Sequence, residues 1–333
     1  MARTIQRIAV AGAGAWGTAL AVVCVQAGRE VMIWAREPEV AEAINGTHEN
    51  SVFLPEIALP ENIKATTSLS ETAAADLILL VCPAQHLRGV VRELAPHLAE
   101  KTIVLICAKG IEQKTGLLMS QVLAEEAPSV IVGVLSGPSF AGEVARGLPT
   151  AVTLAAPVPH GKALAHAIAT PLFRPYVSED IIGAQIGGAV KNVLAIACGV
   201  VQGRRLGESA RSALLTRGFS ELARLGMALG GKAETLNGLS GLGDLVLTGS
   251  SVSSRNMSLG VALGEGLTLE NVLAERRSVS EGVHTALALR DLAGGLGVEM
   301  PIAEAVASLV AGDIDVEAAI TGLLSRPLRS END

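Results

Sequence analysis

Aromatic side chains and charge are both scarce in this sequence, and their scarcity argues against several classes of protein. Phe, Trp and Tyr together make up 2% of the 333 residues, and charged residues make up 18%. The formal net charge is −7 and no basic run is interleaved with aromatics, so nothing supports nucleic-acid binding. A phosphate-bearing ligand would therefore need a local cluster of Lys and Arg.

Cysteine and histidine are too few and too scattered to form a disulfide or metal framework. The four cysteines stand singly in apolar segments without Cys-x-x-Cys spacing, and the six histidines add no ligand pattern. We expect buried free thiols and no metal site.

The opening MARTIQRIAV leads directly into an apolar run, and no uninterrupted apolar stretch reaches membrane-spanning length. We therefore expect a cytoplasmic protein with neither a signal peptide nor a membrane partner.

Apolar residues, in contrast, are abundant. They make up 49% of the chain, and 36 residues are glycine, a composition typical of a tightly packed globular protein. The length of 333 residues exceeds the roughly 250 to 300 residues at which single cores stop growing. We therefore expect two domains.

Apolar β-rich runs alternate with helical segments in the first half of the chain. The expected strands are residues 7–11, 31–34, 77–81, 103–106, 130–134 and 151–154. The alternation predicts a parallel sheet, and strands that are apolar throughout predict helices on both of its faces. From about residue 180 onward helical spacing takes over. The expected helices are residues 181–202, 209–229, 268–275, 282–292 and 302–309.

The run IAVAGAGAWG, from Ile8 to Gly17, ends an apolar strand in Gly-x-Gly-x-x-Gly. Gly12 permits the tight turn, Gly14 lets the backbone approach a diphosphate, and Gly17 lets the following helix pack closely. The N-terminus of that helix supplies an anion site. The pattern predicts a doubly wound Rossmann-type α/β domain for a dinucleotide over residues 1–182. We expect an all-helical substrate and catalytic domain over residues 183–333, with the active site between the two.

Arg36 follows the second strand, where an acidic residue would bind the ribose 2′-hydroxyl of NAD. A guanidinium there can pair with a 2′-phosphate, so we expect NADPH to be accepted and favoured, while the adjacent Glu37 leaves NAD open. A solvated surface arginine is the competing interpretation. Trp16, inside the glycine turn, either covers part of the cofactor or packs at the domain interface.

Two segments follow strands and so lie at the carboxyl edge of the sheet, where ligands of such folds bind. Lys109, in CAKG, is placed to contact an anion or a carbonyl, and Gly110 beside it indicates close backbone approach; a surface lysine is the alternative. In SGPSFA, residues 136–141, the turn can aim backbone N–H groups and the Ser139 hydroxyl at a ligand, although by itself it resembles an ordinary turn.

Lys191 lies in GGAVKNVLAIACGVV, a segment that is apolar around the whole helical circumference and is therefore expected to be buried. Charged side chains are almost never buried without a partner, and desolvation moves the pKa of an ammonium toward neutrality. Lys191 is thus our candidate for a catalytic proton donor and acceptor. The alternative is a lysine near a helix end that reaches solvent.

The stretch LSGLGDLVLTGSSVSSRN, residues 239–256, groups Gly, Ser and Thr around Asp244, Thr248, Arg255 and Asn256. This composition is poor for a helix, and we predict a ligand-binding loop rather than a flexible connector. Asp244 can hydrogen-bond a substrate hydroxyl or hold a catalytic ammonium. Arg255 and Asn256 can grip a phosphate as a charged fork plus an amide.

In their order and spacing, these motifs resemble those of the bacterial NAD(P)-dependent glycerol-3-phosphate dehydrogenases. The motifs are GAGAWG at 12–17, NSVFLP at 50–55, AKG at 108–110, SGPSFA at 136–141, VKN at 190–192, TRG at 216–218, GLGDL at 241–245 and SRN at 254–256. The sequence departs from the family pattern at Gly249, where a cysteine is common, and at Gly142, where a longer and often basic residue is common.

The resemblance implies a role for each motif residue. Lys191 would be the proton donor or acceptor, with Lys109 and Asp244 as its catalytic partners. The residues around the substrate would be Lys109, Gly137, Ser139, Lys191, Asp244, Thr248, Ser254, Arg255 and Asn256. The residues around the cofactor would be Gly12, Gly14, Ala15, Trp16, Gly17, Arg36, Lys109, Ala141, Arg255, Val279 and Glu281.

The reaction implied by the resemblance is the reversible reduction of dihydroxyacetone phosphate by NAD(P)H to sn-glycerol 3-phosphate, a precursor of phospholipids. The resemblance also implies a homodimer. Two alternatives stay open on the sequence. A β-hydroxyacid dehydrogenase of related architecture would recognise a carboxylate instead of a phosphate. A nucleotide-sensing module would bind NADPH without turnover, although Lys191 argues against it.

Overall fold

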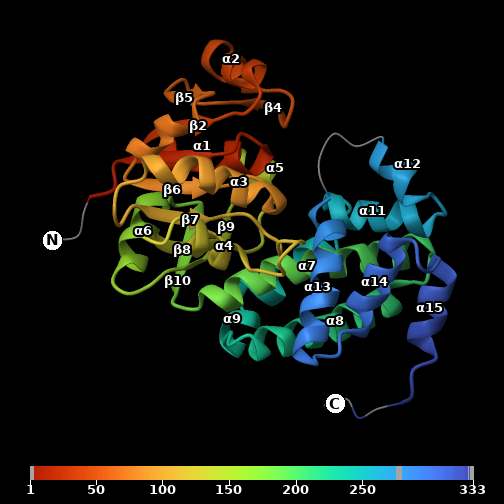
Figure 1. Cartoon of the computed structure of the whole chain (residues 1–333). Helices are drawn as coiled ribbons and strands as arrows, with labels where there is room; N and C mark the ends of the chain where they lie inside the picture. The colour runs from red at the N-terminus through yellow and green to blue at the C-terminus, as the bar shows by residue number, and fades with distance from the viewer. Residues whose placement is uncertain (1–3, 275–279, 329, 331–333) are drawn as a thin grey trace.

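The computed structural model describes residues 4–274, 280–328 and 330. Figure 1 shows two parts side by side: an α/β part built on one large sheet, and a helical part formed by the second half of the chain. The four cysteines are all buried and free, as the sequence predicts.

Eight strands form the large sheet, in the order β10-β9-β8-β7-β6-β1-β2-β5. Their bounds are β1 Arg7–Ala11, β2 Glu30–Trp34, β5 Ile63–Thr66, β6 Leu77–Leu80, β7 Ile103–Ile106, β8 Ile131–Ser136, β9 Thr150–Ala155 and β10 Phe173–Ser178. A separate antiparallel pair is formed by β3 Glu49–Asn50 and β4 Leu54–Ala58. The doubly wound, mostly parallel architecture expected from the sequence is confirmed.

One end of the sheet runs in the opposite direction, which the sequence pattern does not indicate. Strand β9 is antiparallel to β8, and β10 is parallel to β9. The connection between β8 and β9 carries a helix of only five residues, α5 Ala141–Ala145. Such a helix spans about 7.5 Å, too little to return the chain along a six-residue strand of about 20 Å. The chain therefore enters β9 from the near end.

Two strands at the sheet edges, β5 and β10, are absent from the sequence prediction. Strand β10 contains Pro175 and only its first residue, Phe173, is buried, so it lacks the continuous apolar run of the inner strands. Proline is tolerated there because an edge strand has one unpaired side.

Alternate residues of the inner strands enter two separate cores, one on each face of the sheet. Ile8 and Val10 of β1 pack with Leu20 of α1 on one face, whereas Ala9 and Ala11 pack with Leu87 of α3 on the other. The strands are apolar throughout because both faces are covered. The helices of this part are α1 Ala15–Gln26, α2 Pro38–Gly46, η1 Leu69–Ala74, α3 Ala84–Leu94, η2 Ala95–His97, α4 Met119–Glu126, α5 and α6 His160–Ile168.

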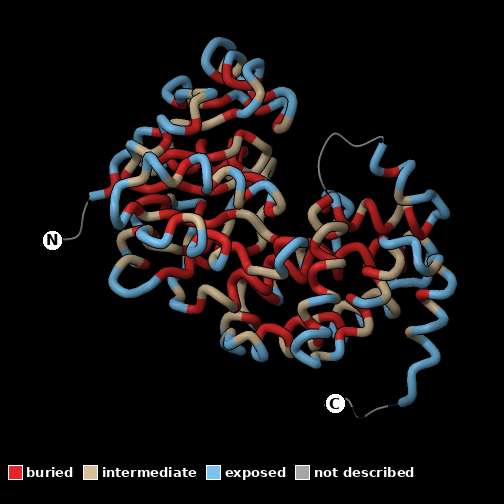
Figure 2. Tube along the Cα trace, viewed as in Figure 1, coloured by how far each residue is buried: buried red, intermediate tan, exposed pale blue. Residues whose placement is uncertain are grey.

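The helical part is organised around α7, Ile181–Gly203, in which every residue from 183 to 201 is buried. Figure 2 shows the buried trace that runs through the middle of this part. By length and composition α7 would suffice to cross a membrane, which the sequence argument overlooked, but 89% of its most apolar window is buried inside the protein. We therefore interpret it as a core helix. Around it lie α8 Glu208–Ala228, α9 Ala233–Leu236, η3 Leu239–Gly243, α10 Asp244–Gly249, α11 Arg255–Gly264, α12 Leu269–Ala274, α13 Glu281–Leu296, α14 Pro301–Ala311 and α15 Val316–Leu324.

The loop conformation predicted for residues 239–256 is wrong, because most of this segment is helical: it forms η3, α10 and the start of α11. Its role in ligand binding stays a prediction. Packing against α7 overrides the weak helix propensity of its glycines and serines. A side chain at Gly187 of α7 would overlap the carbonyl oxygen of Ser240, so the two backbones lie in direct contact.

The crossing of α7 and α11 also depends on glycine. A Cβ added at Gly199 would overlap the carbonyl oxygen of Met257, and one added at Gly260 would overlap that of Ile196. The two helices therefore approach backbone to backbone, and this fixes the start of α11 beside the middle of α7.

We predict that Gly199→Ala lowers the free energy of unfolding by at least ~1–3 kcal/mol, because the added methyl must push the helices apart. Gly294→Ala is the matched control, since it lies on an exposed part of α13 with nothing within 4 Å of the new Cβ. The control is expected to stabilise by about 0.5–1 kcal/mol through helix propensity. Urea denaturation of both variants measures the difference, and equal effects would contradict the packing argument.

Candidate active site

Three charged side chains from different elements meet between the two parts of the protein. Lys109 comes from the loop after β7, Lys191 from the middle of α7, and Asp244 from the start of α10. The two oxygens of the Asp244 carboxylate lie 2.6 Å from Lys109 Nζ and 2.9 Å from Lys191 Nζ. The Asp244 side chain is 1% exposed. One buried carboxylate thus bridges two ammonium groups, as the sequence argument for Asp244 allowed.

Further hydrogen bonds fix both lysines. Lys191 Nζ donates to Thr248 Oγ1 at 2.8 Å, and the Thr248 hydroxyl donates to Asp244. Lys109 Nζ donates to the carbonyl oxygen of Gly137 at 3.0 Å. The lysines are therefore paired and oriented, and neither is the surface lysine considered as an alternative.

The pKa values follow from burial and from the neighbouring charges. Burial disfavours the ammonium of Lys191 and lowers its pKa to about 8, although the charge of Asp244 opposes this. Burial acting alone would raise the pKa of Asp244, but the charges of Lys109 and Lys191 outweigh it and hold that pKa below its ordinary value. The site thus contains an amine with a pKa of about 8 beside a carboxylate whose pKa lies below its ordinary value.

The glycine turn has the geometry that its sequence predicts. Gly12 has a φ of +127° and lies against the backbone of Cys82, while a side chain at Gly17 would overlap the Gly12 carbonyl oxygen. A Cβ at Gly14, the N-cap of α1, would meet nothing within 4 Å, so this face of the turn is open. Among the described residues, the buried indole Nε1 of Trp16 has no hydrogen-bond partner. An open helix N-terminus and an unsatisfied donor fit a bound pyrophosphate, with Ala15 as the first residue of the helix.

Arg36 lies on the surface after β2, and its side chain is 72% exposed. Its Nε and Nη2 both donate to the same carboxylate oxygen of Glu37, at 3.0 and 2.7 Å. A carboxylate thus already occupies the guanidinium fork that is expected to receive a 2′-phosphate.

The remaining substrate candidates, together with the cofactor candidate Ala141, lie at one turn and two helix N-termini. Gly137 has a φ of +143° and accepts a hydrogen bond from the Ser139 hydroxyl. Ala141 opens α5. Ser254 is the N-cap of α11 and accepts from the N–H of Met257 at 3.3 Å, which leaves Arg255 at the first helical position.

Asn256 is engaged in a different way from that predicted. Its amide donates to Asn192 of α7 at 3.0 Å, and its oxygen accepts from the N–H of Gly282 of α13 at 3.0 Å. It therefore joins three helices in addition to any contact with a ligand.

Glu281 joins the two parts of the protein: its Oε1 accepts from the N–H of Ala84, the first residue of α3. Burial raises the pKa of Glu281 to about 7. Val279, the neighbouring cofactor candidate, lies outside the described residues.

Among the described residues, no group of three or more His, Cys, Asp or Glu could hold a metal ion.

Sequence reasoning did not single out Asn192 or Gly188 of α7. A Cβ at Gly188 would lie 2.7 Å from Ser136 Oγ and 3.3 Å from Lys109 Cγ, so this glycine gives the Lys109 side chain room to cross the helix. The paired glycines of GGAVKN indicate a close approach of another chain segment to α7, but the sequence does not show that the segment is the Lys109 side chain.

The chain matches the family models for the N-terminus and the C-terminus of NAD-dependent glycerol-3-phosphate dehydrogenase, over residues 7–161 and 180–321. It is 62% identical over 332 residues to the NAD(P)+ glycerol-3-phosphate dehydrogenase of Parvibaculum lavamentivorans, covering 99% of this chain and 100% of the relative. It is 59% identical over 329 residues to that of Caulobacter vibrioides, covering 98% and 99%. A crystal structure of glycerol-3-phosphate dehydrogenase from Coxiella burnetii superimposes with a TM-score of 0.93 at 38% identity, covering 97% of this chain and 100% of that one.

We predict that Asp244→Asn lowers the pKa of Lys191 below its value of about 8, because the carboxylate raises that pKa. An NMR titration of the lysine ¹³Cε resonances measures the shift, with the Lys191 resonance assigned by its loss in Lys191→Arg. Thr248→Val is the control, because it removes a hydrogen bond to Lys191 but leaves the charge of Asp244 in place. A Lys191 pKa that is unchanged in Asp244→Asn would show that the carboxylate does not control the amine.

Proposed function

The chain belongs to the NAD-dependent glycerol-3-phosphate dehydrogenase family and is an NAD(P)-dependent oxidoreductase, and we propose that Lys191 is its proton donor and acceptor. The reaction is the reversible hydride transfer between NAD(P)H and dihydroxyacetone phosphate that gives sn-glycerol 3-phosphate. The observation that carries the proposal is the buried contact of Lys191 with Asp244, 2.9 Å between Nζ and Oδ1.

A pKa of about 8 suits Lys191 to both directions of the reaction. In reduction, the protonated Nζ donates its proton to the ketone oxygen as negative charge develops there. In oxidation, the neutral amine accepts the proton of the substrate hydroxyl. Asp244 keeps the amine oriented throughout, and Thr248 holds it from a second side. The nicotinamide supplies or accepts the hydride when bound.

The substrate phosphate is proposed to lie at the N-terminus of α11. Ser254 caps this ten-residue helix and Arg255 is its first residue, so backbone N–H groups and a guanidinium belong to the same helix end. Gly137 and Ser139 would contact the substrate from the turn after β8, and Lys109 lies against that turn. Phosphate binding remote from the reacting carbon would orient the carbonyl toward Lys191.

The cofactor is proposed to bind along the carboxyl edge of the sheet. Gly12, Gly14 and Gly17 would cradle the pyrophosphate, and Trp16 Nε1 would gain the partner that it lacks among the described residues. Arg36 would exchange its bond to Glu37 for the 2′-phosphate of NADPH. We propose that Glu281 approaches the cofactor from the helical part, and Val279 stays a prediction from the sequence.

We further propose a cytoplasmic homodimer that supplies sn-glycerol 3-phosphate to phospholipid synthesis and binds neither nucleic acid nor membrane. Exposed apolar side chains on neighbouring elements support a protein interface: Met227 of α8, Leu242 of η3 and Val246 of α10 are 50%, 38% and 49% exposed. The net charge of −7 is consistent with the lack of a polyanionic partner.

We predict that NADPH oxidation depends on dihydroxyacetone phosphate and stays at background with 3-oxo acids. A steady-state absorbance assay tests this, and the opposite substrate pattern would indicate a β-hydroxyacid dehydrogenase.

We predict that Lys191→Met binds NADPH like the parent but that its kcat is lower by about 10²- to 10⁴-fold, because the general acid is gone. Steady-state kinetics and NADPH titration measure the two effects. An unchanged turnover in this variant would rule out the role of Lys191.

We predict that Arg36→Asp shifts cofactor preference from NADPH toward NADH, with KM for NADPH rising about 10- to 100-fold for the loss of a charge-assisted contact. Glu37→Gln should change KM in the other direction, because it releases Arg36 from its internal partner. Steady-state kinetics with each nicotinamide measures both effects. Equal losses with NADH and NADPH in Arg36→Asp would indicate a structural role instead.

A further inference from the structure

Lys109 reaches the active site from a loop, residues 107–118, that joins β7 to α4. The loop backbone pairs with itself at a bridge between Ile111 and Leu118. Both of these side chains are buried in the core of the helical part, in one cluster with Val190 and Val193 of α7. The loop thus crosses from the sheet to the helices, and its position sets the 2.6 Å contact of Lys109 with Asp244.

Helix α3 also holds this loop, through side chains of its own. Arg88 forms a two-pronged bond to Glu112, with Nε to Oε1 at 2.9 Å and Nη2 to Oε2 at 2.8 Å. The Thr115 hydroxyl donates to the same carboxylate at 2.6 Å. The Glu112 side chain is 9% exposed, so it depends on these partners for its charge to be tolerated.

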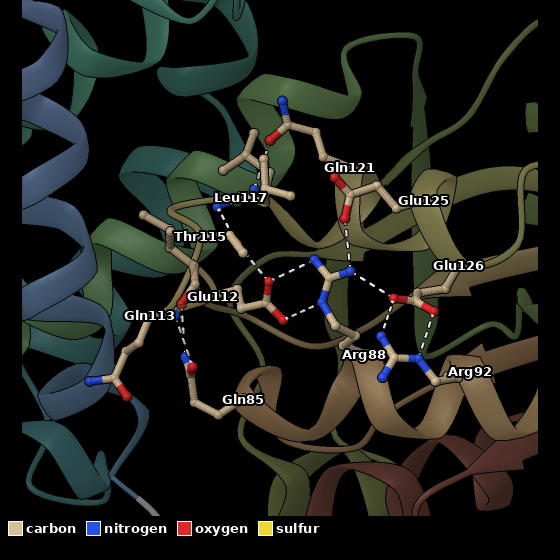
Figure 3. A network of polar contacts seen from close by, with 12 residues as sticks. Gln85, Arg88, Arg92, Glu112, Gln113, Thr115, Leu117, Gln121, Glu125 and Glu126 are labelled. Atoms are coloured by element: carbon tan, nitrogen blue, oxygen red, sulfur yellow. Dashed lines mark hydrogen bonds and ion pairs between the residues drawn. The ribbon is translucent and has the colours of Figure 1, made fainter.

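Gln85, one turn before Arg88, adds two bonds to the loop backbone. Its amide donates to the carbonyl oxygen of Ile111 at 2.8 Å, and its oxygen accepts from the N–H of Gln113 at 3.0 Å. Figure 3 shows the bonds of Gln85 and Arg88 to Gln113 and Glu112. With the bond to the Ile111 carbonyl oxygen, α3 contacts three consecutive loop residues, 111 to 113. These residues begin only two positions after Lys109.

The guanidinium of Arg88 is itself held in orientation by α4. Its Nη1 lies 2.8 Å from Glu125 and 2.7 Å from Glu126. Arg92, one turn further along α3, also pairs with Glu126, but its side chain is 67% exposed, compared with 21% for Arg88. The two arginines share a helix and a partner, but the bonds to Glu112 come from Arg88.

Gly110 leaves the loop little freedom between α3 and the helical part. A Cβ there would lie 2.7 Å from Ala84 Cβ of α3 and 3.2 Å from Glu281 of α13. Lys109 therefore joins a closely packed residue, and Gly110 joins it directly to the segment 111–113 that α3 holds.

We propose that Arg88 is a positioning residue for the reaction: its fork to Glu112 fixes the loop that holds Lys109 against Asp244. This inference rests on the proposed function of Lys191, which shares Asp244 with Lys109. Arg88 positions Glu112, the loop that contains Glu112 positions Lys109, and Lys109 contacts the Asp244 carboxylate that also contacts Lys191.

The consequence appears in the protonation of Lys191. The charged groups that face it are Asp244 of α10, Lys109 of the loop, Arg255 of α11 and Glu281 of α13. The positive charge of Lys109 lowers the pKa of Lys191, and Lys109 also shares its carboxylate. Withdrawal of Lys109 therefore raises the pKa of Lys191 above about 8. Oxidation of sn-glycerol 3-phosphate, which needs the neutral amine, would then require a higher pH.

The test compares Arg88→Ala with Arg92→Ala, which removes the same charge from the same helix. Arg88→Ala should lower kcat about tenfold or more, equivalent to at least 1.4 kcal/mol. It should leave KM for NADPH within about twofold and raise the pKa in the pH profile of oxidation. Arg92→Ala should behave like the parent. Arg88→Lys keeps the charge without the planar fork and should restore activity only in part. Glu112→Gln, which keeps the side-chain shape, should repeat the effects of Arg88→Ala and covers the case in which that variant does not fold.

A double-mutant cycle with Lys109→Met tests whether Arg88 affects kcat through Lys109. If Arg88 acts through Lys109, Arg88→Ala should change kcat by less than about twofold in the Lys109→Met background. Three outcomes would overturn the proposal: an unshifted pH profile in both Arg88→Ala and Glu112→Gln, equal effects of Arg88→Ala and Arg92→Ala, or an equally large effect of Arg88→Ala with and without Lys109. Full activity of Lys109→Met would also overturn it. A failure of the proposed function is separate, because it would show as unchanged turnover in Lys191→Met.

Discussion

The structure depends on the ionised carboxylate of Asp244, which balances two ammonium groups in a buried place. Burying charged groups costs desolvation energy, and the Asp244 carboxylate offsets part of that cost because it lies within 3 Å of both lysine Nζ atoms. One lysine belongs to the sheet part and the other to α7, so the same interaction that makes the site reactive also joins the two halves. Loss of the carboxylate would leave two like charges facing each other.

The helix that carries Lys191 meets two demands that oppose each other. It must be buried deeply enough to move the pKa of an amine toward neutrality, and it must allow other backbones to come close enough to supply partners. Three glycines allow the close approach, because each leaves space that a side chain would fill. Gly187 leaves space for the backbone of η3, Gly188 for the side chain of Lys109, and Gly199 for the backbone of α11. The apolar residues between them meet the first demand.

Much of the fold and part of the site can be predicted from the sequence because they depend on local patterns. Apolar runs predict the inner strands, the spacing of glycines predicts the turn after β1, and a lysine inside a wholly apolar helix predicts burial with a perturbed pKa. The direction of β9, the helices at residues 239–249 and the engagement of Asn256 between helices do not follow from such patterns. Each depends on a neighbour that is distant in the sequence.

The sequence by itself determined the class of cofactor, the order of the two parts and the identity of the buried amine, since periodicity and residue type act over a few neighbouring positions. Only the tertiary structure decided which groups surround that amine. Asp244 lies 53 positions from Lys191 and 135 from Lys109, and Arg88 is joined to Glu112 across 24. Charges interact through space rather than along the chain, and folding alone brings them within a few ångströms.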